Sequence, residues 1–284
     1  VAMWIREQSG GHTKIIFIGK PSSMPEDYDL IIYSAEHQFP PLPNLQPITL
    51  PLMRVDEAQV TAAANEWEAR LADLPRPLTA FLVGGPTGPF LFNARAAHRL
   101  QSIIRQVIEE TGGTAYITTS RRTPPAVVEA LQSDLPGAAR LFTWSTDASD
   151  NPYRALLGLA DGFVVTGDSI SMMVEVVRLR KPLAILGLPV GVLGAFDQLR
   201  RSLTRWLFAP RCRGPLDRLR QAAGRVLYRM RILTHTRDFV AFHNMLVTKG
   251  LAVHAGEPLR APTAGVPDDL AIAVQRIEAL VRNS

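Results

Sequence analysis

Short apolar runs alternate with helix-spaced segments along most of the chain, and this pattern predicts an α/β fold. Near the N-terminus, residues 13–19 and 29–35 are apolar runs bounded by turn residues, as buried parallel strands are. The proline-rich residues 39–53 predict an extended connection with one edge strand, because proline cannot donate to a sheet ladder. Residues 56–74 then have helical spacing, which the prolines at 75 and 77 end.

A second, longer series of alternating elements follows these prolines. The series predicts strands at 78–85, 114–120, 139–144, 162–167 and 182–188. It predicts intervening helices at 93–111, 124–132 and 152–160, and a further helix after residue 168. Repeated β-α-β units form parallel sheets with helices on both faces. A chain of 284 residues with 46% hydrophobic content is long enough for two such cores.

Composition narrows the classes of protein that fit. A single cysteine, Cys212, excludes a disulfide framework and a cysteine-rich metal site, and it fits a reducing compartment. The N-terminus lacks the features of a secretory signal, and no apolar run reaches the length of a membrane span. We therefore expect a cytoplasmic protein, and the absence of clustered Asp and His residues predicts no metal site.

Positive charge is concentrated in residues 200–237, which contain eleven arginines and one acid, Asp217. Large apolar residues such as Trp206 and Phe208 are interleaved with the arginines. A segment of this kind can lie on an anionic membrane surface, hold a phosphorylated substrate, or form a solvated helical face. Nucleic acid is not expected as a partner, because no recognition module accompanies the charge.

Ligands of parallel sheets bind beyond the carboxyl ends of the strands, so the residues that follow each strand are candidates. The glycines of the first turn would let backbone N–H groups approach an anion, although an ordinary tight turn fits as well. The second turn offers hydroxyl and guanidinium donors, although a surface turn also accepts arginines. The residues concerned are Gly84, Gly85, Thr87 and Gly88 in the first turn, and Ser120, Arg121 and Arg122 in the second.

The later turns add a helix start and a carboxylate. Trp144 follows the third strand, and Asn151 before Pro152 is expected to cap a helix. After the fourth strand, a helix N-terminus could hold a phosphate through its free N–H groups and dipole. Glu175, one turn inside this helix, could accept from ribose hydroxyls, and its apolar neighbours mean that it needs a partner. The turn itself consists of Thr166, then the cap-type residues Asp168, Ser169 and Ser171, and Met172.

Four stretches resemble the bacterial relatives of the plant mitochondrial-fission ("elongated mitochondria") family, which are regarded as glycosyltransferases of the GT-B type. These stretches are GGPTGPF at 84–90, SRRTP at 120–124, NPY at 151–153 and VTGDSISMMVEVVRLRKPLAIL at 165–186. The resemblance extends to RD at 237–238, FHNMLVTKGLA at 242–252 and DDLAIAVQRIEAL at 268–280. It implies a nucleotide-sugar donor site, with Ser169, Ser171 and Met172 at the diphosphate and Glu175 at the ribose.

The resemblance also implies two Rossmann-like domains. Residues 1–60 with the final helix, 268–284, would form the acceptor-side domain, and residues 61–267 the donor domain, including the basic helical segment at 200–237. The expected donor-binding residues are Gly84, Gly85, Thr87, Gly88, Ser120, Arg121, Trp144, Asn151, Thr166, Asp168, Ser169, Ser171, Met172 and Glu175. The nucleotide sugar would be a co-substrate, and we expect neither a metal nor another cofactor.

The expected reaction is displacement of a nucleoside diphosphate from an activated sugar by an acceptor hydroxyl. His37 is the candidate base, although a histidine at a strand end is more often structural. We expect a lipid-linked or phosphorylated acceptor, such as an envelope glycolipid, and a peripheral location at the inner membrane face.

Two departures qualify the resemblance. Relatives carry an acid after this histidine where Gln38 stands, and they carry a further stretch upstream, so the first domain is expected to be truncated.

Two other function classes remain to be weighed. The chain could be a non-catalytic adaptor at a membrane surface that retains a nucleotide-sugar-binding fold, because fold does not establish chemistry. A sugar-transfer assay separates this hypothesis from the first. A nicotinamide-dependent dehydrogenase is disfavoured, because the sequence lacks the dinucleotide fingerprint and its acidic partner.

Overall fold

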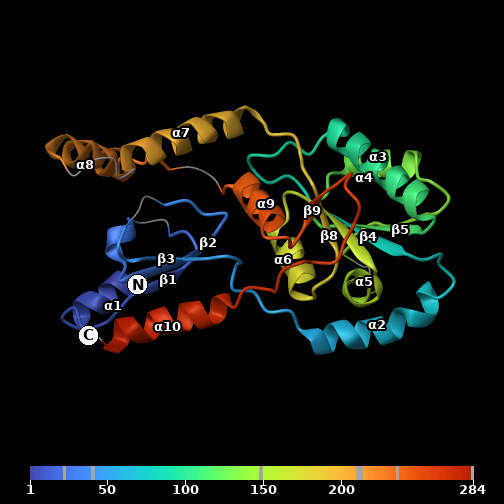
Figure 1. The fold of residues 1–284 in the computed structure, drawn as a ribbon, viewed down its shortest axis with the longest axis horizontal. Coiled ribbons are helices and arrows are strands. Elements are labelled where there is room, and N and C mark those ends of the chain that lie inside the picture. The colour runs from blue at the N-terminus through green and yellow to red at the C-terminus, as the bar shows by residue number, and fades with distance from the viewer. Residues whose placement is uncertain (22–23, 40–41, 147–149, 209–213, 235–236, 283–284) are drawn as a thin grey trace. The chain divides into compact units, whose positions relative to one another are not determined.

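The chain forms two compact units, each with its own parallel sheet (Figure 1). The computed structural model describes residues 1–21, 24–39, 42–146, 150–208, 214–234 and 237–282. Unit 1 consists of Val1–Leu52, Val192–Ala241 and Pro267–Ser284. Unit 2 consists of Met53–Gly191 and Phe242–Val266.

In the residues that the structure describes, unit 2 is built on six parallel strands. They are β4 (Leu78–Val83), β5 (Thr114–Thr119), β6 (Ala139–Phe142), β7 (Gly162–Thr166), β8 (Leu183–Leu186) and β9 (Val253–His254). The helices of this series are α2 (Glu57–Leu71), α3 (Ala94–Thr111), α4 (Pro125–Ser133), α5 (Tyr153–Leu159), α6 (Ile170–Arg178) and α9 (Phe239–Thr248). The strand order is β6-β5-β4-β7-β8-β9, and every pairing is parallel.

Helices cover both faces of this sheet, which confirms the predicted α/β class. In Figure 1, α3 and α4 pack together on one face, and α2 and α5 pack together on the other. Phe81, Ile117 and Val164, one from each central strand, are buried in a core that also contains residues of α3 and α4. Asn93 caps α3, and Gly112 ends it with a φ of +67°, as the sequence pattern predicts.

The connections place a topological switch point between β4 and β7. From β4 the chain moves outward through β5 to β6, and then crosses back to β7 and moves outward on the other side through β8. Neighbouring strands whose connections leave in opposite directions form a switch point, and ligands bind beyond their carboxyl ends. The loops after β4 and β7 are therefore the first place to look for a site.

Unit 1 has a smaller parallel sheet, in which β1 (Ile16–Ile18), β2 (Leu30–Ser34) and β3 (Leu45–Ile48) pair in that order. Pro47 lies in an edge strand, the position predicted for the proline-rich segment. Ala273, on the last helix, packs with Leu30, Ile32 and Ile48 of the sheet. The other elements are α1 (Ala2–Gln8), the 3-10 turn η1 (Pro25–Asp27), α7 (Val192–Phe208), α8 (Pro215–Arg229) and α10 (Asp269–Arg282).

The basic segment is grouped differently from the expectation, which placed residues 200–237 in the donor domain. The structure assigns Val192–Ala241 to unit 1. The physical reason is a small core in which Leu207, Phe208 and Tyr228 of α7 and α8 are buried, with Met24 of unit 1 packed against them. Sequence order places the segment between β8 and β9 of unit 2 and does not reveal this contact.

Candidate functional site

The switch point of unit 2 brings together three of the four turns that the sequence analysis selected. The Gly84 N–H donates to Thr166 Oγ1 at 2.8 Å, and the Gly85 N–H donates to Asp168 Oδ2 at 2.8 Å. These bonds join the loop after β4 to the end of β7. Thr123 Oγ1 donates to the Gly84 carbonyl at 2.6 Å, which joins the loop after β5 to the same place.

Close packing requires glycine at two positions of the first loop. A Cβ on Gly84 would lie 2.1 Å from Asp168 Oδ2, and a Cβ on Gly85 would lie 2.1 Å from the Arg122 carbonyl oxygen. Gly88, in contrast, is exposed and would have open space around a Cβ. The interpretation that the glycines leave their amides facing an anion is thus corrected for Gly84 and Gly85, because these amides bond within the protein.

Asp168 is the acid at the centre of these contacts, and its side chain is fully buried. Burial raises the pKa of Asp168, while hydrogen bonds from Thr166 and the Gly85 amide and the charge of Arg122 oppose that rise. From the sequence, Asp168 is a cap-type residue of the following helix. Its carboxylate instead turns to the loop after β4, where it accepts the Gly85 N–H.

The N-terminus of α6 has no side-chain cap. Ser169 is the N-cap residue, but its hydroxyl makes no capping hydrogen bond. Ser171 lies inside the helix and is exposed, and Met172 is half-buried. The first-turn amides of α6 are therefore left uncapped by Ser169, and uncapped amides at a helix N-terminus favour an anion.

Arg122 was not among the expected donor-binding residues, yet it contacts the loops of the site. Its Nη1 donates to Thr87 Oγ1 at 2.6 Å, and its Nη2 lies 3.6 Å from Asp168 Oδ2. The Arg122 side chain is 47% exposed, so the cation remains accessible to solvent. The neighbouring Arg121, which was expected to bind the donor, is exposed. No periodic signal distinguishes two adjacent arginines in a loop, so the sequence pattern could not choose between them.

The remaining predicted donor residues support neighbouring elements. Ser120 Oγ accepts from the Arg122 N–H at 3.3 Å, within the loop after β5. The Trp144 N–H donates to Thr119 Oγ1 at 2.9 Å, beside the edge strand β6 and two strands from β4. Asn151 Oδ1 accepts from the Tyr153 N–H at 3.0 Å and so supports the start of α5, although Pro152 and not Asn151 is the N-cap residue of this helix.

Glu175 has the partner that its apolar neighbours demand. The Tyr153 hydroxyl donates to Glu175 Oε2, so the contact joins α5 to α6. Burial raises the pKa of Tyr153 well above its ordinary value, and the neighbouring Glu175 adds to that rise. A ribose hydroxyl would therefore have to share the Glu175 carboxylate with Tyr153.

His243, from α9, supports the turn after β7 and was not selected from the sequence. Its Nε2 lies 2.8 Å from the Gly167 carbonyl oxygen, and its ring stacks on Phe90 at a centroid distance of 6.2 Å. A Cβ on Gly167 would lie 2.8 Å from the His243 ring, so this turn needs glycine as well. The residues are 76 positions apart, a separation at which local patterns carry no signal.

His37, the predicted base, follows β2 in unit 1 and is 9% exposed. Its Nε2 lies 3.7 Å from Glu36 Oε1, so an acid accompanies the histidine although Gln38 replaces the acid expected after it. Gln38 Nε2 donates to Asp238 Oδ2 at 2.7 Å, and the Asp238 N–H donates to the Glu36 carbonyl at 2.7 Å. Within the described residues, no group of three or more His, Cys, Asp or Glu side chains is arranged to hold a metal.

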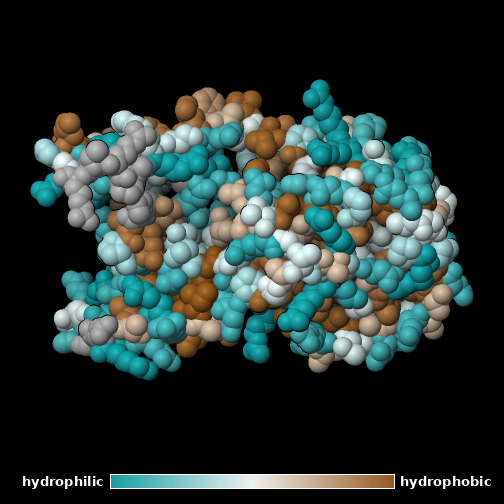
Figure 2. Space-filling view, in the orientation of Figure 1, coloured by the Kyte–Doolittle hydropathy of each residue, from teal (hydrophilic) through white to brown (hydrophobic). Residues whose placement is uncertain are grey.

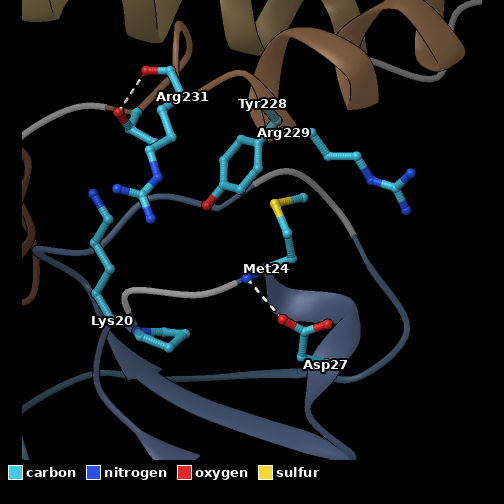
Figure 3. A pocket seen from close by; sticks show the side chains of 8 residues that line it. Lys20, Met24, Asp27, Tyr228, Arg229 and Arg231 are labelled. Atoms are coloured by element: carbon cyan, nitrogen blue, oxygen red, sulfur yellow. Dashed lines mark hydrogen bonds between the residues drawn. The ribbon is translucent and has the colours of Figure 1, made fainter.

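Unit 1 also contains a pocket of about 510 Å³ with a cationic lining. Figure 3 shows the Lys20 amine, the Arg231 guanidinium and the Tyr228 hydroxyl pointing into the space, whereas Arg229 points away. Asp27 accepts from the Met24 N–H at 3.1 Å. Burial lowers the pKa of Lys20, which Asp197 opposes and Arg201 and Arg200 reinforce. A half-buried amine near guanidinium groups is stabilised in its charged form by a bound anion.

Comparisons with known proteins agree with the family suggested by the sequence. The chain is 31% identical over 148 residues to the Mitochondrial fission protein ELM1 of Arabidopsis thaliana, and 29% identical over 153 residues to an uncharacterized protein of Rickettsia prowazekii. These alignments cover 52% and 54% of this chain but 34% and 43% of the relatives' own lengths.

Two solved structures are also similar. A glycosyltransferase from Rickettsia africae has 9% identity and a TM-score of 0.40, covering 98% of this chain and 73% of that chain. The ADP-heptose heptosyltransferase II of E. coli has 19% identity and a TM-score of 0.34, covering 51% of this chain and 41% of that chain. The family model described as Mitochondrial fission ELM1 matches residues 1–230, and the chain belongs to this family.

Proposed function

We propose that the protein acts in sugar transfer from a nucleotide sugar to an acceptor hydroxyl, as a GT-B-like glycosyltransferase. One observation carries the proposal. The loops after β4, β5 and β7 are joined at the switch point of unit 2, beside a helix N-terminus that no side chain caps. Such an arrangement is suited to a nucleoside diphosphate. The relatives are longer than the part that aligns with this chain, so this activity is proposed for the whole protein.

In this proposal the donor lies along the start of α6. The first-turn amides of α6 bind the diphosphate, and Arg122 supplies a cation beside it. Glu175 accepts from the ribose and exchanges part of its bond to Tyr153 for that contact. Asp168 and His243 do not touch the ligand in this proposal. They hold the loops in position through their bonds to Gly85 and Gly167.

The chemical step would be a displacement at the sugar. The acceptor oxygen forms a bond to the anomeric carbon, and the bond from that carbon to the diphosphate oxygen breaks, so the nucleoside diphosphate leaves with the electron pair. The hydroxyl proton passes to a base, for which His37 beside Glu36 is the candidate. Helix amides and Arg122 stabilise the charge that develops on the leaving group.

We propose that the acceptor is anionic and binds in the cationic pocket of unit 1. Lys20, Tyr228 and Arg231 would supply an amine, a hydroxyl and a guanidinium to one phosphate group. Phosphate binding should weaken as the pH rises through the lowered pKa of Lys20, because the neutral amine no longer attracts an anion.

Two measurements test the proposal. Calorimetric titration of the full chain with a panel of nucleoside diphosphates should give saturable binding to at least one of them, and Ser169→Pro, which disturbs the start of α6, should abolish it. A transfer assay with radiolabelled nucleotide sugars and a lipid extract should then transfer label to lipid. Absence of binding across the panel would exclude the donor site.

A second candidate is a non-catalytic adaptor that retains this fold. The observation that favours it is internal pairing: the Gly84 and Gly85 amides and the Asp168 and Glu175 carboxylates all bond within the protein. Nucleotide binding without transfer to any acceptor would support this second function.

A further inference from the structure

The helices α7 and α8 carry two exposed rows of large apolar side chains, which we call the apolar stripes. In each row the residues recur mostly every three or four positions, which keeps them on one face of the helix. On α7 their exposed fractions run from 40% to 76%, and on α8 and its C-cap from 55% to 80%. The stripes are Val192, Phe196, Leu199, Leu203 and Trp206 on α7, and Leu216, Leu219, Val226 and Met230 on α8.

These stripes are not the faces by which the helices pack together. Leu207, Phe208 and Tyr228 fill the contact between α7 and α8, and Gly224 allows the close approach, since a Cβ there would lie 3.1 Å from the Phe208 ring. In Figure 2, hydrophobic side chains appear over α7 and α8 at the upper edge of the view. Large exposed apolar patches of this kind mark sites that bind another protein, a membrane or a ligand.

Charge indicates what covers the stripes. Residues 192–234 contain ten arginines and two aspartates. Both aspartates are paired on their own helices, Asp197 with Arg200 at 2.6 Å and Asp217 with Arg220 at 2.9 Å. A second copy of this chain would bring the same excess of positive charge against the first. An anionic lipid surface instead offers acyl chains to the stripes and phosphates to the arginines.

We propose that α7 and α8 lie along an anionic bilayer surface, with the apolar stripes at the acyl boundary and the exposed arginines at the level of the phosphates. In the described part of the chain, no helix is long and apolar enough to cross a bilayer, so the proposed contact is one of surface binding. The proposal goes beyond sugar transfer, because binding to the bilayer surface does not require a bound nucleotide.

The test is co-sedimentation of the full chain with vesicles of phosphatidylcholine, alone or mixed with phosphatidylglycerol. The protein should bind the anionic vesicles, and part of this binding should survive at about 1 M salt, where the screening length falls to about 3 Å. The double variant Leu199→Glu with Leu219→Glu should lower the vesicle partition coefficient by about tenfold or more, because both charges enter the stripes. The tryptophan fluorescence of the parent protein, to which Trp206 contributes, should shift to the blue on binding.

The matched control is Leu270→Glu, on the exposed side of α10 in the same unit, where Leu270 is 62% exposed. This variant should leave vesicle binding within about twofold of the parent, because Leu270 lies outside the apolar stripes of α7 and α8. Circular dichroism of both variants checks that each still folds. If high salt removes all vesicle binding, or if Leu270→Glu loses as much vesicle binding as the double variant, the apolar stripes do not insert into the bilayer.

Two further outcomes separate this inference from its competitors. A parent protein that dimerises without lipid, and whose double variant is monomeric, would show that a second copy covers the stripes and would overturn the proposal. Nucleoside diphosphate titration of the double variant should match the parent, because the donor residues lie in unit 2. Vesicle binding without any nucleotide binding would contradict the proposed transferase and leave the membrane contact standing.

Discussion

The buried carboxylate of Asp168 contacts all three loops of the switch point or belongs to them. Asp168 accepts the Gly85 amide and lies near Arg122, so three loops depend on one side chain. Because burial raises its pKa, the folded protein holds the proton more tightly than the unfolded chain does. The stabilising effect of the protonated form is complete below the ordinary pKa of 3.8 and is lost as the pH rises through the raised value.

Asp168→Asn and Asp168→Ala should separate this charge from the hydrogen bond. The asparagine oxygen can still accept the Gly85 N–H and has no charge to bury, so stability should depend less on pH above 3.8 than in the parent. Alanine leaves the buried Gly85 amide unpaired and should lower the free energy of unfolding by about 1–3 kcal/mol. Denaturant unfolding between acidic and neutral pH measures both effects. An asparagine variant with the parent's pH dependence would contradict a raised pKa at Asp168.

Substitutions at Glu175 and at its partner Tyr153 test the proposed ribose contact. Glu175→Ala should weaken nucleoside diphosphate binding by about 1–3 kcal/mol, the usual effect of losing a charge-assisted hydrogen bond. Tyr153→Phe removes the hydroxyl that competes with the ribose for the Glu175 carboxylate. Nucleotide binding should therefore be kept or strengthened, because the carboxylate remains. Calorimetry on both variants distinguishes the two roles. Equal affinity in Glu175→Ala and the parent would remove Glu175 from the donor site.

At the scale of elements, the sequence predicts the sheet of unit 2 well because local signals decide it. Buried apolar runs define β4, β5, β7 and β8, and turn residues separate them from their helices. Elements fixed by distant contacts were missed. β9 has two residues and pairs with β8, and α1 has no buried residue, so neither carries a strong pattern.

The same difference applies to the candidate site. Residues that follow strands were found, because topology alone brings strand ends together. The residues that contact them could not be predicted. Arg122 and Arg121 are adjacent in one loop and differ only in where their side chains point, and His243 contacts Gly167 from the distant helix α9. The basic segment was recognised as unusual, but its two stripes and its packing on unit 1 became clear only from the helix faces.

Helix α10 depends on one buried acid for its place in unit 1. Asp269 accepts the Thr49 N–H at 2.6 Å and the Leu50 N–H at 2.7 Å, directly after β3. Asp269→Ala should lower the free energy of unfolding of unit 1 by about 1–3 kcal/mol, because a buried amide loses its acceptor. Hydrogen exchange at β2 and β3 should report the loss.

The neighbouring Asp268 provides a matched control. Its carboxylate accepts the Ala271 N–H at 3.0 Å in an exposed position. Asp268→Ala should destabilise unit 1 less than Asp269→Ala does, because water replaces the lost bond. Equal destabilisation by the two variants would show that the buried contact to β3 does not hold α10 in place.

At the scale of the whole molecule, the two units differ in how much core each contains. Among the described residues, the sheet of unit 1 has three short strands, its core with α10 has four buried residues, and its core at α7 and α8 has four more. In the described part of unit 2, the sheet has six strands, and the core beneath α3 and α4 alone has fifteen buried residues. Smaller cores hold less stability, so regions of one chain can open at different free energies.

We therefore expect unfolding in two steps, with unit 1 first. In hydrogen exchange, the amides of β1 to β3 should lose protection before those of β4, β5 and β7. A nucleoside diphosphate at about 100 times its Kd should stabilise the later step by about 2.7 kcal/mol and leave the earlier step unchanged, because every proposed donor residue lies in unit 2. Differential scanning calorimetry with and without nucleotide measures both steps. A single transition that nucleotide shifts as a whole would show that the units unfold together, and a shift of the earlier step alone would place the nucleotide in unit 1.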